Sequence, residues 1–348
     1  MTVAIRSLST ALAPHLLPQD VVGRRAEEVL GPRYPQFARL LSTFASAGIE
    51  TRRSVVPFDW FDARAIGWKE RNDAYLAGAA ALFLDAAATA LDEAGWRAAD
   101  VDVVVTVSST GVATPTLEAL VADEMGFRAD ALRVPVFGLG CAGGASGLSI
   151  AAQLARGAPG ARVLLVVVEA CTVSFRTDRL QKSDIIATVL FGDGGAAACL
   201  QAGEGPMTCA PGAQHRWPDT LGIMGWDVDD EGLGVVFDRS IPDFATRHMA
   251  GARDAAFAAM GRTVEDVDRL ICHPGGAKVI QALESSLDLG QGALDLERDI
   301  LRAHGNMSAP TVLFVLDAAR RAGLRGRMMA TALGPGFSAA FTPVEMAA

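Results

Sequence analysis

Three side chains of the kinds that perform nucleophilic chemistry lie in short, turn-forming runs of the sequence. Cys141 lies in GLGCAGG, His273 in CHPGG and Asn306 in GNMS. They supply a thiol nucleophile, an imidazole and a neutral amide donor. This set suits carbon–carbon bond formation on thioesters, because a Cys can carry the acyl group while two donors stabilise a developing enolate oxygen.

The run around Cys141 follows a strand-like segment and precedes a helix-like one. We expect the positive end of the helix dipole to lower the pKa of the thiol and raise its thiolate fraction. A buried structural cysteine is the simpler alternative. The run also matches the dinucleotide fingerprint, with Gly138, Gly140 and Gly143 in place and Glu169 ending the next strand. Its position deep in the chain and the Cys inside it count against nucleotide binding.

His273 and Asn306 each have a structural alternative. His273 follows apolar residues and precedes a Pro-Gly-Gly turn, so it can reach a cleft or serve as a core imidazole bonded to a carbonyl. Asn306 can donate to a substrate, tolerate a left-handed backbone or cap the following helix. In company with Cys141, the catalytic interpretation of both is favoured.

Composition limits the class of protein. The chain has 348 residues, more than one core usually holds, so two fused halves are expected. A net charge of −9 argues against nucleic-acid binding, and five Cys without a Cys-x-x-Cys motif indicate reduced thiols in the cytoplasm. No residues group at metal-ligand spacing, so no metal is expected. No signal peptide is recognised, and the longest apolar run, residues 163–168, is too short to span a membrane.

Strand-like and helix-like segments alternate along the chain. Two helices are expected, over residues 74–94 and 147–155. Buried strands are expected over residues 101–107, 134–137, 163–168, 270–272 and 328–333. This alternation predicts an α/β layer protein.

Landmarks of the first half recur about 165 residues later. Cys141 and Asn306 are 165 positions apart, and an Asp-Val-Asp triplet opens strand-like runs at residues 100–102 and 266–268. The echo predicts two duplicated halves, 1–205 carrying the Cys and 206–348 carrying the His and Asn, with residues 201–217 as the linker. The Cys and Asn turns would then face each other across a pseudo-twofold axis.

At this point the sequence resembles the type III polyketide synthases, the chalcone synthase-like branch of the thiolase-fold condensing enzymes. The three runs above carry the resemblance together with LFGDG (190–194), TVLFVLD (311–317) and the GPG ending (334–336). It covers residues 52–343, and residues 56–71 look like bacterial members that extend long fatty acyl starters. The resemblance implies an α/β, five-layered αβαβα thiolase-like fold, a homodimer and no cofactor besides CoA-thioester substrates.

The resemblance implies a role for each matching residue. Cys141 would accept the acyl group as a thiolate held by His273, and His273 and Asn306 would stabilise the enolate formed when malonyl-CoA loses CO₂. Phe191 would be the gatekeeper aromatic between the CoA tunnel and the cavity. The cavity would be lined or shaped by Glu169, Cys171, Ser174, Ser109, Thr114 (near the dimer interface) and the turn Gly334, Pro335 and Gly336.

Some positions depart from the plant enzymes. Val235 stands where they carry a second gate Phe, Leu333 stands where they carry Phe, and Cys171 and Ser174 replace Thr. These changes argue against chalcone formation and for a differently shaped cavity. The family's basic CoA-phosphate cluster is matched only by Arg39, Arg52, Arg53 and Lys278.

The expected function is iterative decarboxylative condensation of malonyl-CoA onto an acyl-CoA starter, including a long-chain fatty acyl one, with cyclisation to an alkylpyrone or resorcinol-type product. Two alternatives stay open. A fatty-acid-initiating ketoacyl synthase shares the Cys-His-Asn set but usually carries Thr in place of Met307, takes malonyl from a carrier protein and stops after one condensation. A non-enzymatic acyl-CoA-binding protein on the same fold would lack one of the three residues, and none is missing.

Overall fold

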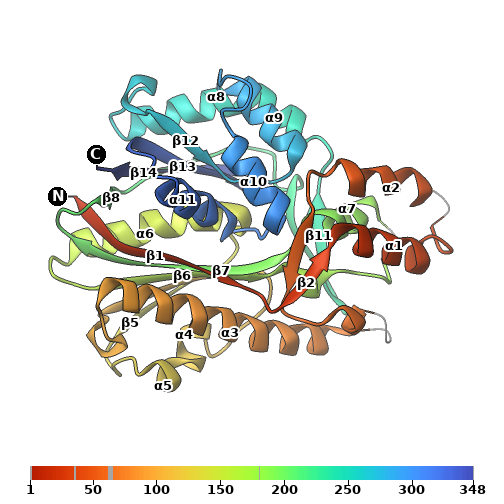
Figure 1. Cartoon of the computed structure of the whole chain (residues 1–348), viewed down its shortest axis with the longest axis horizontal. Coiled ribbons are helices and arrows are strands. Elements are labelled where there is room, and N and C mark those ends of the chain that lie inside the picture. Colours follow the sequence, from red (N-terminus) through yellow and green to blue (C-terminus); the bar gives the residue numbers. More distant parts are fainter. Residues whose placement is uncertain (1, 35–36, 62–65, 180, 348) are drawn as a thin grey trace.

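One ten-stranded sheet runs through the molecule (Figure 1). The computed structural model describes residues 2–34, 37–61, 66–179 and 181–347. Within them the strands follow the order β5–β4–β6–β7–β1–β8–β14–β13–β12, and β9 adds to β14. The short strand β8 (Met207–Cys209) joins the two parts of the sheet, because it pairs with both β1 and β14.

The first part of the sheet contains two parallel pairs and two antiparallel ones. β4 pairs in parallel with β5 and β6, and β7 is antiparallel to β6 and β1. β4 and β6 are buried along their whole length, as their β-branched runs predict, whereas the expected burial of β5 is wrong because β5 is an edge strand with exposed side chains. The bounds are β1 (Val3–Leu12), β4 (Val103–Val107), β5 (Leu132–Val136), β6 (Val163–Ala170) and β7 (Asp193–Ala202).

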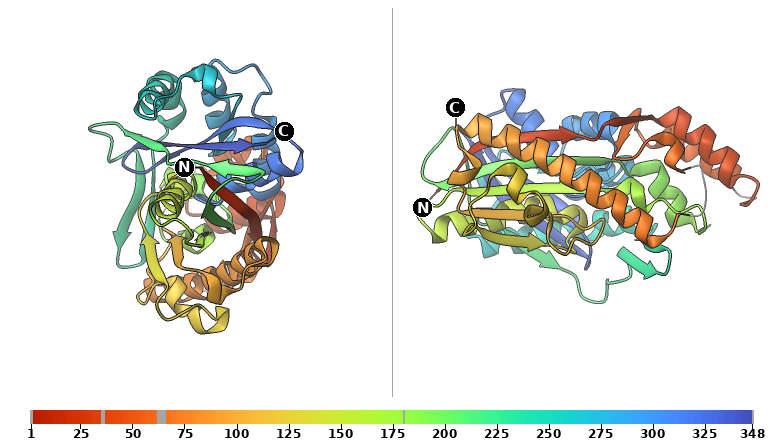
Figure 2. Two further views of the ribbon diagram at one scale, coloured as in Figure 1. Left: turned by 90° about the vertical axis from the view of Figure 1, so that its left-hand side faces the viewer. Right: turned by 90° about the horizontal axis from the view of Figure 1, so that it is seen from below.

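Helix α3 (Trp68–Ala94) covers the outer face of this part and lies diagonally across its strands in Figure 2. Small alanines on its buried stripe, with Tyr75, Leu82 and Phe83, let it lie close to β1, β6 and β7. By length and composition alone α3 could cross a membrane. In this fold, its apolar stripe instead forms a core with the sheet.

Helices α6 (Gly143–Gly157) and α11 (Thr311–Arg321) form the central layer. They contact each other and both parts of the sheet. Most of their residues are buried in one core that also holds strand residues from both halves. A helix that is apolar nearly all round is the form expected between two sheet layers.

The second part of the sheet carries its own outer helices. Helices α8 (Ile241–Ala259) and α9 (Ala277–Ser286) cover it, while α10 (Asp295–His304) contacts α9 and α11. The layers are therefore α3, sheet, α6 with α11, sheet, and α8 with α9, which confirms the expected five-layered αβαβα fold (Figure 1). The remaining strand bounds are β9 (Ala213–Arg216), β12 (Arg269–Cys272), β13 (Gly326–Gly334) and β14 (Ser338–Met346).

The two halves repeat in topology and in detail. β12, β13 and β14 are related as β4, β6 and β7 are, a parallel pair followed by an antiparallel one. The carboxylate of Asp102 accepts the backbone N–H of Arg162 at 2.8 Å, and that of Asp268 accepts the backbone N–H of Arg327 at 2.7 Å. The Asp-Val-Asp echo therefore marks equivalent strand beginnings.

A peripheral group of elements lies beyond one end of the layers (right in Figure 1). It contains α1 (Gln19–Leu30), α2 (Phe37–Ser46), α7 (Lys182–Leu190), the ribbon β2 (His15–Pro18) with β3 (Thr51–Ser54), and the hairpin β10 (Met224–Asp229) with β11 (Gly232–Phe237). Two short helices, α4 (Leu117–Leu120) and α5 (Ala122–Met125), follow β4.

The segment expected as the linker between the halves is structured. Residues 201–217 contain β8 and β9, which add to the sheet, so the glycines and prolines there make turns between short strands. The division of the chain at residue 205 stays a prediction.

Candidate active site

Cys141 lies in a single turn of 3-10 helix (Gly140–Ala142) that leads into α6. Gly140 has a φ of 47°, and a side chain there would meet Pro335. A side chain on Gly144 would meet the carbonyl oxygen of Ala309, at the start of α11. The glycines thus let the Cys turn approach the other half of the molecule closely, and this packing accounts for the pattern that resembles a dinucleotide fingerprint.

The Cys141 thiol is buried, and burial raises its pKa to about 11. Hydrogen bonds with Ser308 and Asn306 lower the pKa by less. The expectation of a lowered pKa is therefore wrong for the site without substrate, because loss of hydration outweighs the start of α6. The thiol is the favoured form until a base accepts its proton.

His273 follows β12 and is held by its backbone, whose N–H donates to the carbonyl of Thr331 at 2.8 Å. Its ring is buried, and neither Nδ1 nor Nε2 has a hydrogen-bond partner among the described residues. Burial lowers the pKa of the imidazole to about 3, so the ring is neutral near pH 7. A core imidazole would be bonded to a neighbour, so these two orphaned nitrogens indicate a ligand-facing group.

The Asn306 side chain is fixed from both ends of its amide. Nδ2 donates to the carbonyl of Gly275 at 3.2 Å, and Oδ1 accepts the N–H of Ser308 at 2.8 Å. The Sγ atom of Cys141 lies 4.0 Å from the same Oδ1. Nδ2 keeps one hydrogen for another acceptor. Asn306 does not cap α11, which begins at Thr311.

Two adjoining pockets share Cys141, Met224 and Phe237 as lining residues, and all three candidate residues line the first of them. The first, named here the His273 chamber, is bounded by Cys141, His273 and Asn306. Its other walls come largely from α8, α9 and the hairpin. Apart from Gly275 and Thr331, they are apolar side chains: Met224, Phe237, Ile241, Met249, Val279, Leu283, Ala332 and Leu333.

The second, the Phe191 chamber, also reaches Cys141. It combines small polar side chains with an apolar wall. Among its lining residues are the expected Ser109, Cys171, Phe191, Val235 and Pro335, together with Thr110, Met224, Trp226, Phe237 and Ser308. Sequence reasoning missed these last five, although Ser308 stands inside the quoted GNMS run.

Phe191 packs against Phe237, whereas the resemblance to the plant enzymes places the second gate residue at position 235. Its ring packs edge-on against Phe237 with centroids 6.3 Å apart. Val235, at the expected second gate, lies two residues earlier on the same face of β11. The chamber therefore has two facing aromatic rings despite the Val.

Backbone bonds tie Phe191 to the Asn306 turn. The N–H of Asn306 donates to Leu190, and its carbonyl accepts the N–H of Gly192. The buried guanidinium of Arg52 donates to the carbonyls of Thr188 and Phe191, each at 2.7 Å. The gate and the amide donor are therefore one connected unit.

Glu169 lies fully buried behind the Phe191 chamber. Its carboxylate accepts the N–H of Ser109 and the hydroxyl of Thr110, both at 2.9 Å. Burial raises its pKa to about 7 against these bonds. Glu169 thus positions Ser109 and Thr110, which line the Phe191 chamber. Among the described residues, Glu169 itself lines neither chamber.

The other expected cavity residues lie in different places. Ser174 is buried in a small separate pocket beside Arg71, and Thr114 is exposed at the molecular surface. Gly334 and Gly336 flank Pro335 in the β13–β14 turn, where a side chain on Gly334 would collide with Ala142. The turn thus presses Pro335 against the Cys segment.

The expected CoA contacts are partly wrong. Arg52 is fully buried, and burial lowers its pKa to about 9, so it holds the fold rather than a phosphate. Arg53 donates to the carbonyl of Ala13, and Lys278 is exposed at the start of α9. The side chain of Arg39 lies outside the described residues.

Comparison with known proteins agrees with this geometry. The N-terminal domain of chalcone and stilbene synthases matches residues 62–205, and the C-terminal domain matches residues 209–344. A 1,3,6,8-tetrahydroxynaphthalene synthase from Streptomyces peucetius subsp. caesius is 38% identical over 97% of this chain and 92% of that protein.

Solved structures give the same result. The 1,3,6,8-tetrahydroxynaphthalene synthase of Streptomyces coelicolor A3(2), a bacterial type III polyketide synthase, has a TM-score of 0.92 at 26% identity, with 100% of both chains covered. Germicidin synthase from Streptomyces coelicolor shares the fold with a TM-score of 0.92 at 23% identity, over 99% of both chains. The chain therefore belongs to the chalcone and stilbene synthases, the acyl-transferring type III polyketide synthases.

Proposed function

We propose that this protein extends an acyl-CoA starter by repeated decarboxylative condensation with malonyl-CoA and then cyclises the chain to an alkylpyrone or resorcinol-type product. The observation that carries the proposal is the meeting of Cys141, His273 and Asn306 at one pocket, the His273 chamber, which shares Cys141 with the Phe191 chamber. The chemistry needs CoA thioesters and no cofactor.

The first step loads the starter onto the enzyme. The sulfur of Cys141 attacks the starter thioester, neutral His273 accepts the thiol proton, and CoA leaves as the thiol by taking that proton. The unpaired ring nitrogens of His273 support this role. A thiol with a pKa of about 11 requires such a base near pH 7.

The second step forms the carbon–carbon bond. Malonyl-CoA loses CO₂, and its thioester oxygen becomes an enolate stabilised by N–H donors of Asn306 and His273. The enolate carbon attacks the acyl carbonyl on Cys141, and the Cys sulfur leaves. Reloading the longer chain from CoA onto Cys141 permits another round.

The walls of the His273 chamber support an alkyl starter. Its mainly apolar lining suits an alkyl chain, while the small polar residues of the Phe191 chamber suit a growing chain of ketones. The relative named for tetrahydroxynaphthalene supports a second product class, because that ring system carries hydroxyl groups and no alkyl chain.

A starter panel tests the proposal. Purified protein is incubated with malonyl-CoA alone and with acetyl- to palmitoyl-CoA, beside Cys141→Ala, and products are identified by mass spectrometry. Multiply extended pyrones or resorcinols with an alkyl tail, absent in the variant, support it. Hydroxynaphthalenes from malonyl-CoA alone would replace the starter assignment. One condensation that requires malonyl on carrier protein would contradict iterative extension.

A cytoplasmic homodimer is part of the same proposal. The dimer is supported by exposed apolar side chains on the edge strand β5 and directly after it, Leu132 and Phe137. Light scattering on the purified protein measures the mass in solution. A monomer at micromolar concentration would contradict the dimer.

A further inference from the structure

The β10–β11 hairpin has two chemically different faces. Side chains alternate along a strand, and residues paired across strands share a face. Trp226 pairs with Val235 and Met224 with Phe237, and all four line the Phe191 chamber. The opposite face is formed by the pairs Asp227 with Gly234 and Asp229 with Gly232.

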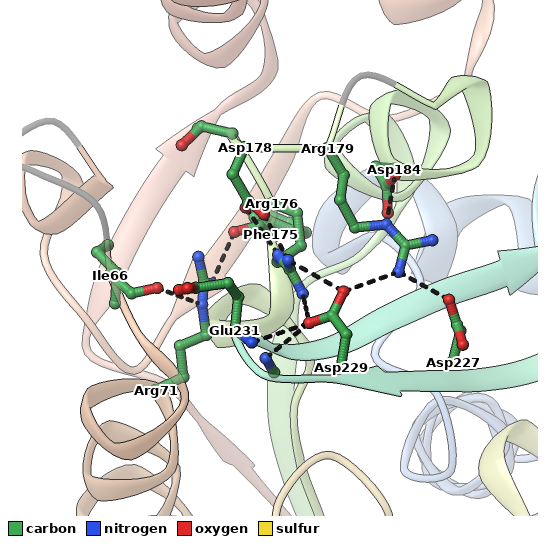
Figure 3. Close-up of polar contacts among 12 residues, drawn as sticks. Ile66, Arg71, Phe175, Arg176, Asp178, Arg179, Asp184, Asp227, Asp229 and Glu231 are labelled. Carbon is green, nitrogen blue, oxygen red and sulfur yellow. Dashed lines mark hydrogen bonds and ion pairs between the residues drawn. The ribbon is translucent and has the colours of Figure 1, made fainter.

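The acidic face rests on two arginines from the segment that follows β6 (Figure 3). Nη1 of Arg176 lies 2.8 Å from Asp229, and the same guanidinium also bonds Asp178. Nη1 of Arg179 lies 3.1 Å from Asp227 and 3.5 Å from Asp229. Asp229 is therefore shared between the two arginines, as the dashed lines of Figure 3 show.

The backbone of β11 is shaped to receive Arg179. A side-chain carbon on Gly234 would lie 1.8 Å from Nη1 of Arg179. The guanidinium thus occupies the space that any other residue at position 234 would fill. Gly234 directly precedes Val235, so a shift of this contact moves a residue of the chamber wall.

The same guanidinium reaches the helix that ends beside the gate. Nε of Arg179 lies 3.5 Å from the buried carboxylate of Asp184 on α7, and α7 ends at Leu190, next to Phe191. Arg179 therefore joins the hairpin carrying Phe237 to the helix leading to Phe191.

Arg71 fixes the neighbouring wall. Its Nη1 donates to the carbonyls of Val173 and Phe175 at 2.7 and 2.8 Å, in the segment that follows Cys171. The charged cluster of Figure 3 thus supports the Phe191 chamber from outside without touching its interior.

We propose that Arg179 is a positioning residue that sets the spacing between the rings of Phe191 and Phe237 in the Phe191 chamber, and thereby how many malonyl units are added before the chain is released. This inference rests on the proposed function of the same site. The ion pairs of Arg179 with the exposed carboxylates of Asp227 and Asp229 add little net stability, so the geometry that these two pairs impose is their main effect here. A wall displaced by about 1 Å can change the rate of a step on the order of 10²-fold.

The test compares Arg179→Gln, Arg179→Lys and a matched control, Arg253→Gln. The side chain of Arg253 is 11% exposed and pairs with a 60% exposed Asp254, much as Arg179 is 13% exposed and pairs with a 62% exposed Asp227. Arg253 lies on α8 and lines neither chamber. Each protein receives malonyl-CoA and its preferred starter.

Three quantities are measured: the ratio of early-released to fully extended products, the loading of Cys141 by intact mass, and the melting temperature. We expect Arg179→Gln to raise the product ratio by about fivefold or more, the size of effect that uncoupling contacting groups produces. Loading should stay within about twofold of the parent, since Cys141 lies outside the cluster. Arg179→Lys should restore part of the parent ratio, and Arg253→Gln should leave it unchanged.

Gly234→Ala provides a second route if Arg179→Gln does not fold. It displaces the guanidinium without removing a charge, and the same product shift is expected. A parent-like ratio in both variants, or a uniform fall of all products together with the melting temperature, would overturn the inference. If the parent itself makes no multiply extended product, the proposed function fails and the inference falls with it.

Discussion

The turn that carries Cys141 and the turn that carries Asn306 occupy equivalent places in the two halves, yet they are built by opposite means. The Cys turn approaches its partner by lacking side chains, since Gly140 and Gly144 lie where a carbon atom would collide with Pro335 or Ala309. The Asn turn is held by side-chain bonds to backbone. Asn306 accepts from Ser308, and the hydroxyl of Thr311 accepts the N–H of Met307.

The different construction of the two turns fits the different chemical roles proposed for Cys141 and Asn306. A nucleophile that exchanges acyl groups must lie close to the donors of the other half, and the glycines permit this approach. A donor that stabilises charge needs a fixed direction before the charge appears. Duplication brings two turns together at one place, and divergence gives one the bond-making group and the other the preorganised donors.

Cys141→Ala should have the largest effect of the variants considered, and it should separate condensation from decarboxylation. Condensation should fall by about 10⁴-fold or more, because no acyl thioester can form. Decarboxylation of malonyl-CoA should persist, since Asn306 and His273 are unchanged. Product formation and CO₂ release measure the two separately. Cys209→Ala, which removes another buried thiol, is the control. Equal loss of both reactions in Cys141→Ala would mean that the turns do not divide the chemistry.

Asn306→Ala should have the converse and smaller effect. Loss of one preorganised donor should slow decarboxylation by about 10²–10³-fold, while the acyl group still loads onto Cys141. Stopped assays of CO₂ release and intact-mass measurement of loading distinguish these outcomes. Decarboxylation at the parent rate would show that the amide is not a donor to the enolate.

Each half contains a buried glutamate that affects the free energy of unfolding. Burial raises the pKa of Glu169 and that of Glu297 to about 7, although each accepts backbone N–H bonds. An acid whose pKa is higher in the folded state favours folding when protonated, and that contribution is lost as pH rises from about 4.5 to 7. Each group should therefore cost on the order of 3 kcal/mol of stability above pH 7.

Glu169→Gln and Glu297→Gln should consequently gain stability over the parent as pH rises from 5 to 8. Gln resembles the protonated acid, so each variant should be close to the parent at pH 5. Urea unfolding at both pH values measures the difference. A gap that stays constant with pH would show that these carboxyls titrate normally.

The smallest effect is expected from reshaping a chamber. Leu283→Phe fills part of the His273 chamber, whose apolar walls come mainly from the second half. It should shift preference from long toward short acyl starters by about tenfold. Competition between two acyl-CoA starters in one reaction gives the ratio directly. An unchanged ratio would place the starter chain elsewhere.

The sequence predicts most of the buried strands, and it singles out three chemical groups that the structure brings to one pocket, for physical reasons. β6 is buried on both faces, so its β-branched run is continuous, and glycine turns leave a clear pattern around Cys141. The sequence repeat between the halves can be recognised because the carboxylates of Asp102 and Asp268 each accept a backbone N–H at the start of a strand.

Other features depend on tertiary contacts that leave no local signal. Arg52 appears as a surface cation in the sequence, yet it is buried against backbone carbonyls. The pKa of Cys141 is set by burial, which helix position alone does not reveal. Phe237 faces Phe191 only because the hairpin folds over the cavity, so no pattern near Phe237 indicates a gate.

The central place of β1 in the sheet has a consequence for biosynthesis. Val3 pairs with Ala202 on one side and with Cys209 on the other. Strand β1 leaves the ribosome long before β7 and β8, so it must wait for more than half of these 348 residues before it gains either neighbour. Contacts this distant in sequence are slow to form. We expect nascent or truncated chains that end before β7 to expose an unpaired apolar strand, and to depend on chaperones for protection until translation passes residue 209.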